Sequence, residues 1–355
     1  MTPPLVLGAG PAGSVAALLL AKAGRTPVLI DRDAVVGDAI CGGFLSWKTA
    51  GALRELGCGP DELGAHVVRR LRLFSSTGTA EAMLPEPGFG LSRHALDTAL
   101  RNAAVSAGAE LMVERARDIA RGRIVTDRRE WRPGALFLAT GKHDVRGEAR
   151  PRRSGDPALG LRIRIAPTPE RRKLIGDAIE LHLFEGGYAG IVLHEDGSAN
   201  VCLALRKSAM AGAGGKPHDL LRAYAAIAPA FAARLGALAG DEPVDTIGAV
   251  PYGWIARETE DGVYRLGDQA AVIPSLAGEG MSIALASARD GVAAFLEGKS
   301  APSFQAAFAR RAASPVRTAE GLWRIGETKR GGSALTGLTG RVPALARLAM
   351  RMSRI

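Results

Sequence analysis

Three short stretches with different hydrophobic patterns follow one another within the first 31 residues. The continuous apolar run at 4–7 is typical of a buried strand in a parallel sheet. Residues 11–24 are rich in Ala and Leu and predict a helix that ends at Gly24, because glycine readily adopts the conformation that closes helices. A second apolar run at 26–30 predicts another buried strand, which leads directly into Asp31. This order predicts a βαβ unit.

Further along, the pattern predicts more strands and one clear helix. Apolar and polar positions alternate over 67–84, which predicts two strands joined by a turn at 75–78. Residues 92–107 predict a helix that begins at a serine cap and ends before a glycine. The apolar run at 135–139 predicts another buried strand.

The pattern changes between about residues 150 and 250, where apolar and polar residues alternate. Such alternation is typical of an antiparallel sheet whose two faces meet different surroundings. A helix is predicted over 218–235, and the strand at 263–266 and the helix at 278–296 then return to the earlier pattern. We therefore predict an α/β chain in which an antiparallel sheet is inserted between the pieces of another domain.

A glycine fingerprint, Gly8-Ala9-Gly10-Pro11-Ala12-Gly13, joins the first strand to the first helix. Gly8 permits the sharp turn, Gly10 lets a pyrophosphate approach the backbone, and Gly13 lets the helix approach the strand. Unpaired N–H groups at the start of the helix would face the phosphates. Asp31, at the end of the next strand, is placed to accept hydrogen bonds from a ribose. Because strand, helix, second strand and acid occur in register, the sequence predicts a dinucleotide site.

A second glycine-rich helix start follows late in the chain. Gly267-Asp268 comes after a predicted strand, and Pro274 and then Gly278-Glu279-Gly280-Met281 precede the helix. This segment would bring another carboxylate and another set of N–H donors to the same ligand. One half of a dinucleotide needs only the first fingerprint, so the second one indicates a cofactor with two functional ends.

Together with Arg93 in the segment 91–97, these motifs resemble the flavoproteins with a p-hydroxybenzoate-hydroxylase-like fold. That superfamily includes aromatic monooxygenases, geranylgeranyl reductases and flavin-dependent halogenases. The resemblance covers most of residues 1–310 and implies FAD as the cofactor. It implies that Asp31 binds the adenosine ribose, that Asp268 contacts the ribityl and pyrophosphate region, and that 278–281 lies beside the isoalloxazine ring.

The resemblance also implies a full set of FAD contacts and a domain plan. The expected contacts are Gly8, Gly10, Pro11, Ala12, Gly13, Asp31, Arg32, Cys41, Gly42, Arg93, Ala139, Thr140, Gly141, Gly267, Asp268, Pro274, Gly278, Glu279, Gly280 and Met281. The expected domains are a Rossmann-like FAD-binding domain of 1–66, 88–150 and 256–312, an antiparallel β-sheet substrate domain of 67–87 and 151–255, and a C-terminal basic helical segment of 313–355.

The sequence motifs indicate the reaction less clearly than the cofactor. The stretch 41–46 and the turn 278–281 look most like geranylgeranyl reductases, in which the first stretch passes close to flavin and substrate. However, the segment 187–193 lacks the Trp, Phe and Pro of the reductase pattern Y-x-W-x-F-P. The segment 139–146 lacks the Asp of the monooxygenase pattern A-D-G, and the W-x-W-x-I-P signature of tryptophan halogenases is absent. Catalytic residues stay unassigned, with candidates near the ring at Cys41, Gly42, Gly43, Tyr188 and Trp254.

The leading expectation is an NAD(P)H- and O2-dependent monooxygenase that hydroxylates a hydrophobic or aromatic small molecule, because oxygenation is common in the superfamily. The main alternative is reduction of isoprenoid double bonds by a geranylgeranyl-reductase-like enzyme. A redox-neutral flavin isomerase or cyclase, and a flavoprotein that acts on RNA, are further alternatives. When a cofactor performs the difficult chemistry, the protein mainly orients and shields the reactants.

Charge and cysteine content limit which binding partners and which cellular compartment we expect. The 46 Lys and Arg exceed the 36 Asp and Glu, which gives a formal charge of +10. No aromatic residues interleave with the arginines as in a single-strand binding platform, so no nucleic-acid partner is expected. The three cysteines show no C-x-x-C spacing, so we expect neither a metal site nor a disulfide framework, and a reducing cytoplasm fits best. No segment approaches the roughly twenty apolar residues that a membrane span needs.

The C-terminal segment 341–355 predicts a basic amphipathic helix. Apolar residues at helical spacing adjoin a stripe of arginines: Leu345, Leu348, Met352 and Ile355 beside Arg347, Arg351 and Arg354. Such a helix can lie on an anionic membrane, which would make the protein membrane-peripheral. The alternative is a closing helix that packs back on the body of the protein.

Overall fold

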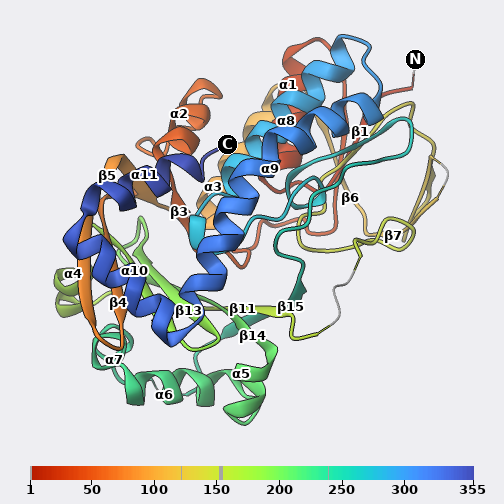
Figure 1. Cartoon of the computed structure of the whole chain (residues 1–355). Helices are drawn as coiled ribbons and strands as arrows, with labels where there is room; N and C mark the ends of the chain where they lie inside the picture. Colours follow the sequence, from red (N-terminus) through yellow and green to blue (C-terminus); the bar gives the residue numbers. More distant parts are fainter. Residues whose placement is uncertain (1, 121, 152–154, 239) are drawn as a thin grey trace.

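The computed structural model describes the whole chain except residues 1, 121, 152–154 and 239. The fold is α/β and contains a parallel sheet, a larger mixed sheet and a small antiparallel sheet. Figure 1 shows the parallel sheet with α1 and α8 at one end of the molecule and the mixed sheet with α5, α6 and α7 at the other.

The parallel sheet is the core of the predicted βαβ domain. Its strand order is β16-β10-β1-β2-β6. The bounds are Leu5–Leu7 for β1, Val28–Asp31 for β2, Glu110–Val113 for β6, Leu136–Leu138 for β10 and Val263–Arg265 for β16. The covering helices are α1 (Pro11–Lys22), α3 (Arg93–Ser106) and α8 (Gly280–Leu296). Helix α1 packs against both α3 and α8, and the apolar residues of β1, β2 and β10 are buried, as their continuous hydrophobic runs predicted.

The mixed sheet has the strand order β15-β11-β14-β13-β12-β4-β5-β3. Its bounds are Phe44–Leu45 for β3, His66–Ser75 for β4, Gly78–Gly90 for β5, Ala158–Ile165 for β11, Ala178–Phe184 for β12, Gly187–Leu193 for β13, Ala199–Arg206 for β14 and Val244–Val250 for β15. All neighbours are antiparallel except β12 and β4, where Ala178 lies opposite Arg70 in a parallel pair. The antiparallel sheet predicted for the inserted segment is therefore present, and one parallel pair with the β4–β5 hairpin makes the whole sheet mixed. The β4–β5 hairpin comes from a distant part of the chain, so no tight turn forces it to run antiparallel to β12.

Helices in the inserted region cover one face of this sheet. They are α4 (Pro169–Ile175), α5 (Lys207–Gly212), α6 (Pro217–Ile227) and α7 (Pro229–Leu235). The single helix predicted over 218–235 is broken at Ala228, which has φ −134° and ψ 87°. Pro229 causes this break, because proline lacks a backbone N–H and keeps the preceding residue out of the helical conformation.

The remaining elements lie outside the two large sheets. They are α2 (Trp47–Glu55), the small sheet of β7 (Ala116–Ala120), β8 (Arg123–Thr126) and β9 (Glu130–Trp131), the short 3-10 helices η1 (Gly267–Gln269) and η2 (Ser275–Ala277), α9 (Ala301–Gly326), α10 (Lys329–Arg341) and α11 (Pro343–Met352). The C-terminal helices α10 and α11 pack against β5, as the blue and orange segments in Figure 1 show. The predicted C-terminal helix is thus present, and no helix in the described residues is long and apolar enough to cross a membrane.

Candidate functional site

One continuous cavity of about 1360 Å³ joins the parallel sheet to the mixed sheet. Its wall includes the glycine fingerprint at one end and residues of α10 and α11 at the other. The expected FAD contacts that line it are Gly8, Gly10, Pro11, Ala12, Asp31, Arg32, Cys41, Gly42, Arg93, Ala139, Thr140, Gly141, Gly267, Asp268, Gly278, Glu279, Gly280 and Met281. Gly13 and Pro274 are not part of the cavity wall. The fold therefore brings segments that are far apart in sequence to one site.

The fingerprint is packed too tightly for larger residues at two of its glycines. Gly8 has φ +101°, and a Cβ on Gly13 would lie 1.8 Å from the carbonyl oxygen of Gly8. Gly10 has more room: the nearest atom to a Cβ there is Nη2 of Arg93, at 3.7 Å. The backbone N–H of Ala9 donates to Oδ2 of Asp31 over 2.6 Å, which fixes this carboxylate at the end of β2. The strand, the turn and the acid thus form one rigid unit.

The N-termini of α1 and α8 both face the cavity. Their N-cap residues, Gly10 and Glu279, make no side-chain capping hydrogen bond. The first N–H groups of a helix need external partners and carry partial positive charge, so both ends suit anionic groups. The long cavity has glycines where a ligand would approach the backbone, and it has two uncapped helix starts. These features fit FAD, which has a pyrophosphate and an electron-accepting ring.

Arg93 connects the start of α3 to the fingerprint. Its guanidinium donates to both oxygens of Asp97, with Nε–Oδ1 at 2.8 Å and Nη2–Oδ2 at 2.6 Å. Burial alone lowers the pKa of Arg93, but the Asp97 carboxylate raises it overall, so the side chain stays cationic. Asp97 thereby holds a positive charge beside Gly10, where the resemblance implies an FAD contact.

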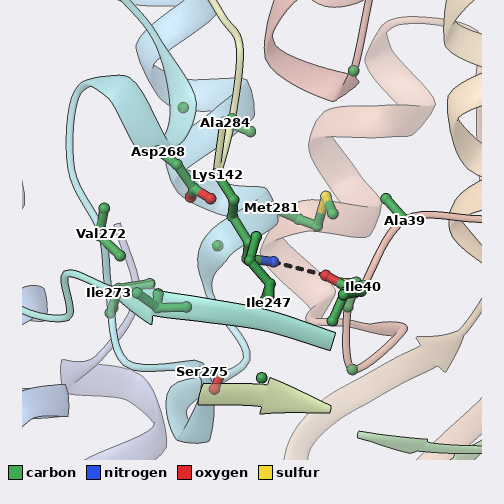
Figure 2. Close-up of a pocket in the computed structure, with 18 of the residues that line it drawn as sticks. Ala39, Ile40, Lys142, Ile247, Asp268, Val272, Ile273, Ser275, Met281 and Ala284 are labelled. Atoms are coloured by element: carbon green, nitrogen blue, oxygen red, sulfur yellow. Dashed lines mark hydrogen bonds between the residues drawn. The ribbon is translucent and has the colours of Figure 1, made fainter. Parts of the chain in front are cut away.

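Three polar residues line the middle of the cavity: Lys142, Asp268 and Arg150. Figure 2 shows the Lys142 side chain crossing the cavity near Asp268, with Nζ donating to the carbonyl of Ile40 over 2.7 Å. Arg150 donates to the carbonyl oxygens of Asp268 (3.0 Å) and Lys142 (2.9 Å) from a buried position. No pattern along the chain indicated this role, because Arg150 lies in a basic stretch that is typical of a solvated surface.

Ionic contacts fix the loop that carries Cys41 and Gly42 against the mixed sheet. Asp38 forms ion pairs with Arg162 and with Arg164 of β11. Polar residues that alternate with apolar ones along a strand are typical of a solvated sheet face, but these two arginines lie against a loop acid instead. Their place on the strand beside a loop acid could not be read from alternation, which does not identify the neighbouring segment.

His194, at the end of β13, packs against the same loop. Its Nδ1 lies 2.8 Å from Nη2 of Arg164, and a Cβ on Gly43 would lie 2.1 Å from its Nε2. Burial, helped by the positive charge of Arg164, lowers the pKa of His194 to about 4. The imidazole is therefore neutral near pH 7 and accepts a hydrogen bond from the guanidinium. A histidine in a strand carried no signal for this contact.

Of the residues predicted to lie near the flavin ring, some line the cavity and Trp254 does not. Cys41 and Tyr188 line the cavity, and the Tyr188 hydroxyl donates to Oγ of Ser275 over 2.8 Å. The Tyr252 hydroxyl lies 2.7 Å from the same oxygen. Burial raises the pKa of Tyr188 well above its usual value, so this hydroxyl keeps its proton at neutral pH. Trp254 does not line the large cavity, and its ring lies 6.0 Å from the guanidinium carbon of Arg150.

The C-terminal tail reaches the second glycine turn. Arg354 is buried, pairs with Glu279 and donates to the carbonyl of Ala277 over 3.0 Å. Its guanidinium also lies 4.5 Å from the ring centroid of Trp47. The arginine stripe predicted for the C-terminal helix is therefore corrected: Arg347 and Arg351 are exposed, but Arg354 belongs to the interior. The helix ends at Met352, so Arg354 leaves the helical register and turns inward.

The far half of the cavity is apolar. Its wall comes from β4, β5, β12, β13, α10 and α11, and includes Leu71, Leu73, Leu84, Ile179, Leu181, Leu183, Leu335 and Met350. Along β13, Tyr188 and Gly190 face this space, whereas Ala189 and Ile191 join the core cluster that contains residues of α6 and α7. Strand alternation thus divides the sheet into a cavity face and a core face.

Comparisons with known proteins agree with this geometry. A family model described as an FAD binding domain matches residues 1–139. Digeranylgeranylglycerophospholipid reductase 2 of Methanopyrus kandleri is 30% identical over 310 residues, which are 80% of this chain and 74% of that protein. The flavin-dependent brominase Bmp2 superposes with a TM-score of 0.76 at 15% identity, covering 99% of this chain and 93% of its own. PqsL of Pseudomonas aeruginosa, described as a probable FAD-dependent monooxygenase, superposes with a TM-score of 0.69 at 17% identity, covering 94% of this chain and 99% of its own. At such low identities, these two structures share the fold alone.

Proposed function

This chain belongs to the p-hydroxybenzoate-hydroxylase-like superfamily of FAD-dependent oxidoreductases, in the family of the digeranylgeranylglycerophospholipid reductases, and from this premise we propose that it reduces carbon–carbon double bonds of a polyprenyl chain. The observation that carries the proposal is the length and lining of the cavity. It continues from the second glycine turn into an apolar space between the mixed sheet and the C-terminal helices. A flexible isoprenoid chain matches such a space by burying apolar surface along its length.

Family membership changes the order of the two reactions considered from the sequence. Oxygenation was favoured there because it is common in the superfamily. The Methanopyrus kandleri protein, which matches 80% of this chain, is named for the reduction of a geranylgeranyl-bearing lipid. The brominase and the monooxygenase resemble this chain in fold at much lower identity. Reduction therefore becomes the proposed reaction, and hydroxylation becomes an outcome that the experiment must exclude.

Each region of the site has a role in this proposal. When bound and reduced, FAD would supply a hydride to one carbon of the double bond. The cavity leucines would hold the chain and exclude water. The second carbon needs a proton, and the Tyr188 hydroxyl lines the cavity and is hydrogen-bonded to Ser275. Ser275 lies at the start of η2, next to the second glycine turn. We assign Tyr188 the proton-donor role, with NAD(P)H as the proposed source of electrons.

The test uses FAD-loaded enzyme and a glycerophospholipid that carries geranylgeranyl chains, without oxygen. Dithionite reduces the flavin in one arm and NADPH in the other, and mass spectrometry follows the lipid. The expected product has gained two hydrogen atoms per reduced double bond, with no oxygen incorporated. A product that forms only with O2 and contains an added oxygen atom would overturn the proposal and support hydroxylation.

Tyr188→Phe tests the proton-donor role separately. Loss of a general acid is expected to lower kcat on the order of 10²-fold while FAD binding is retained. Tyr224→Phe is the matched control, because Tyr224 is also buried but stacks on Phe184 in the separate core cluster near α6. Equal kcat values for Tyr188→Phe and the wild type would exclude Tyr188 as the donor.

A further inference from the structure

Helix α11 exposes a row of apolar side chains. Five of the 12 large hydrophobic side chains exposed in the described part of the chain fall within 338–352: Leu338 (47%), Val342 (41%), Leu345 (44%), Leu348 (51%) and Met352 (55%). Three of them are spaced at i, i+3 and i+7 along α11 and so share one face of the helix. Exposed hydrophobic residues that occur singly need no explanation, whereas a contiguous row marks an interaction surface.

The charge around this row is of one sign. Residues 328–355 contain six Lys or Arg and no Asp or Glu. Arg354 is buried against Glu279, but the other five basic residues are exposed. Arg347 and Arg351 lie on α11 beside the leucines, at helical spacing from each other. The surface of an anionic bilayer has negatively charged headgroups above hydrocarbon. It can therefore bind the arginines and bury the neighbouring apolar side chains.

A different face of the same helix belongs to the cavity. Ala346, Ala349 and Met350 line the cavity wall, together with Ser353 just beyond the helix end. Helix α11 therefore carries the exposed row on one face and part of the cavity wall on another. Figure 1 shows α10 and α11 on the outside of the molecule beside β4 and β5.

We propose that the exposed face of α10 and α11, defined by Leu338, Val342, Leu345, Leu348 and Met352 with Arg347 and Arg351, docks the protein on an anionic membrane surface. Docking would hold the apolar half of the cavity next to the phase in which polyprenyl lipids dissolve. This benefit rests on the proposed function, but the docking itself does not. Vesicle binding needs no substrate and no turnover, so failure of one proposal is distinguishable from failure of the other.

The test measures flotation of the FAD-loaded protein with vesicles of phosphatidylcholine, with and without phosphatidylglycerol. The protein is expected to float with the anionic vesicles and to dissociate as salt rises, because salt screens surface charge. Leu345→Ser with Leu348→Ser is expected to weaken binding roughly tenfold or more, because apolar side chains lose burial in the bilayer. Arg347→Glu with Arg351→Glu is expected to weaken it by roughly 25-fold or more. Ile227→Ser is the matched control, since Ile227 is exposed on the distant helix α6.

Unchanged melting temperature and FAD content must accompany the loss of flotation, which separates lost docking from misfolding. Two results would overturn the proposal. One is that the wild type does not float with anionic vesicles, or that both double variants float as well as the wild type. The other is that light scattering finds a dimer that Leu345→Ser with Leu348→Ser converts to a monomer, without vesicle binding. That result would assign the face to a second copy of this chain.

Discussion

Replacing Arg354 tests whether the C-terminal tail stabilises the second glycine turn. Glu279 has no exposed side-chain surface, and Arg354 is its ion-pair partner. Burial lowers the pKa of Arg354 to about 10, which still leaves it charged at neutral pH. Arg354→Met would leave a buried carboxylate without its cation, which typically costs about 3–5 kcal/mol. With an unfolding entropy of roughly 2.1 cal/mol/K per residue and 355 residues, this corresponds to a melting temperature lower by about 4–7 °C.

The assay is thermal unfolding of the FAD-loaded protein followed by circular dichroism, with flavin fluorescence as a second signal for cofactor release. Arg351→Met is the matched control, because Arg351 is exposed at the end of α11, three residues before Arg354, and it should melt within about 1 °C of the wild type. Adding Glu279→Gln to Arg354→Met removes the unpaired charge and should recover most of the loss. If Arg354→Met and Arg351→Met have the same melting temperature, the ion pair does not stabilise the turn and the reasoning is refuted.

Two further predictions concern His194 and the glycine beside it. Gly43→Ala places a Cβ 2.1 Å from Nε2 of His194 at φ +71°, so urea unfolding should show a loss of at least about 2 kcal/mol. Gly42→Ala, with nothing within 4 Å, should change stability far less, and equal losses would contradict the clash. The pKa of His194 is about 4 in the folded protein and near its usual 6.5 when unfolded. Below pH 6.5 the unfolded chain therefore binds a proton that the folded chain excludes, and the free energy of unfolding should fall by about 3 kcal/mol between pH 6.5 and 4. His194→Asn should lose this part of the pH dependence, and an unchanged slope would show that another group titrates.

The FAD-binding half could be predicted because its signals are local. The fingerprint from Gly8 to Asp31 is contiguous, and each residue acts on a neighbour a few positions away or on the next strand. Ser92 was predicted as a helix cap, and its Oγ accepts from the N–H of Ala95. The second glycine turn was predicted for the same reason, since the strand, the acid and the helix start occur together.

The alternating pattern between 150 and 250 predicted strands but not their neighbours. Alternation fixes which residues share a face, and it does not say which face meets the cavity or which strand pairs with which. The parallel pairing of β12 with β4 joins segments more than 100 residues apart in sequence, and no local pattern encodes it. Trp254 was a candidate near the flavin ring, yet it does not line the large cavity.

By itself, the sequence determined the cofactor, the βαβ core and the amphipathic character of the C-terminal helix, because turns, caps and periodicity act over short distances. Only the tertiary structure decided that Arg354 turns inward to Glu279 and that His194 packs on Gly43. It also decided that the inner face of α11 lines the cavity while its leucines stay exposed. The physical reason is that burial and ion pairing depend on which distant segments meet, and a one-dimensional pattern does not contain that information.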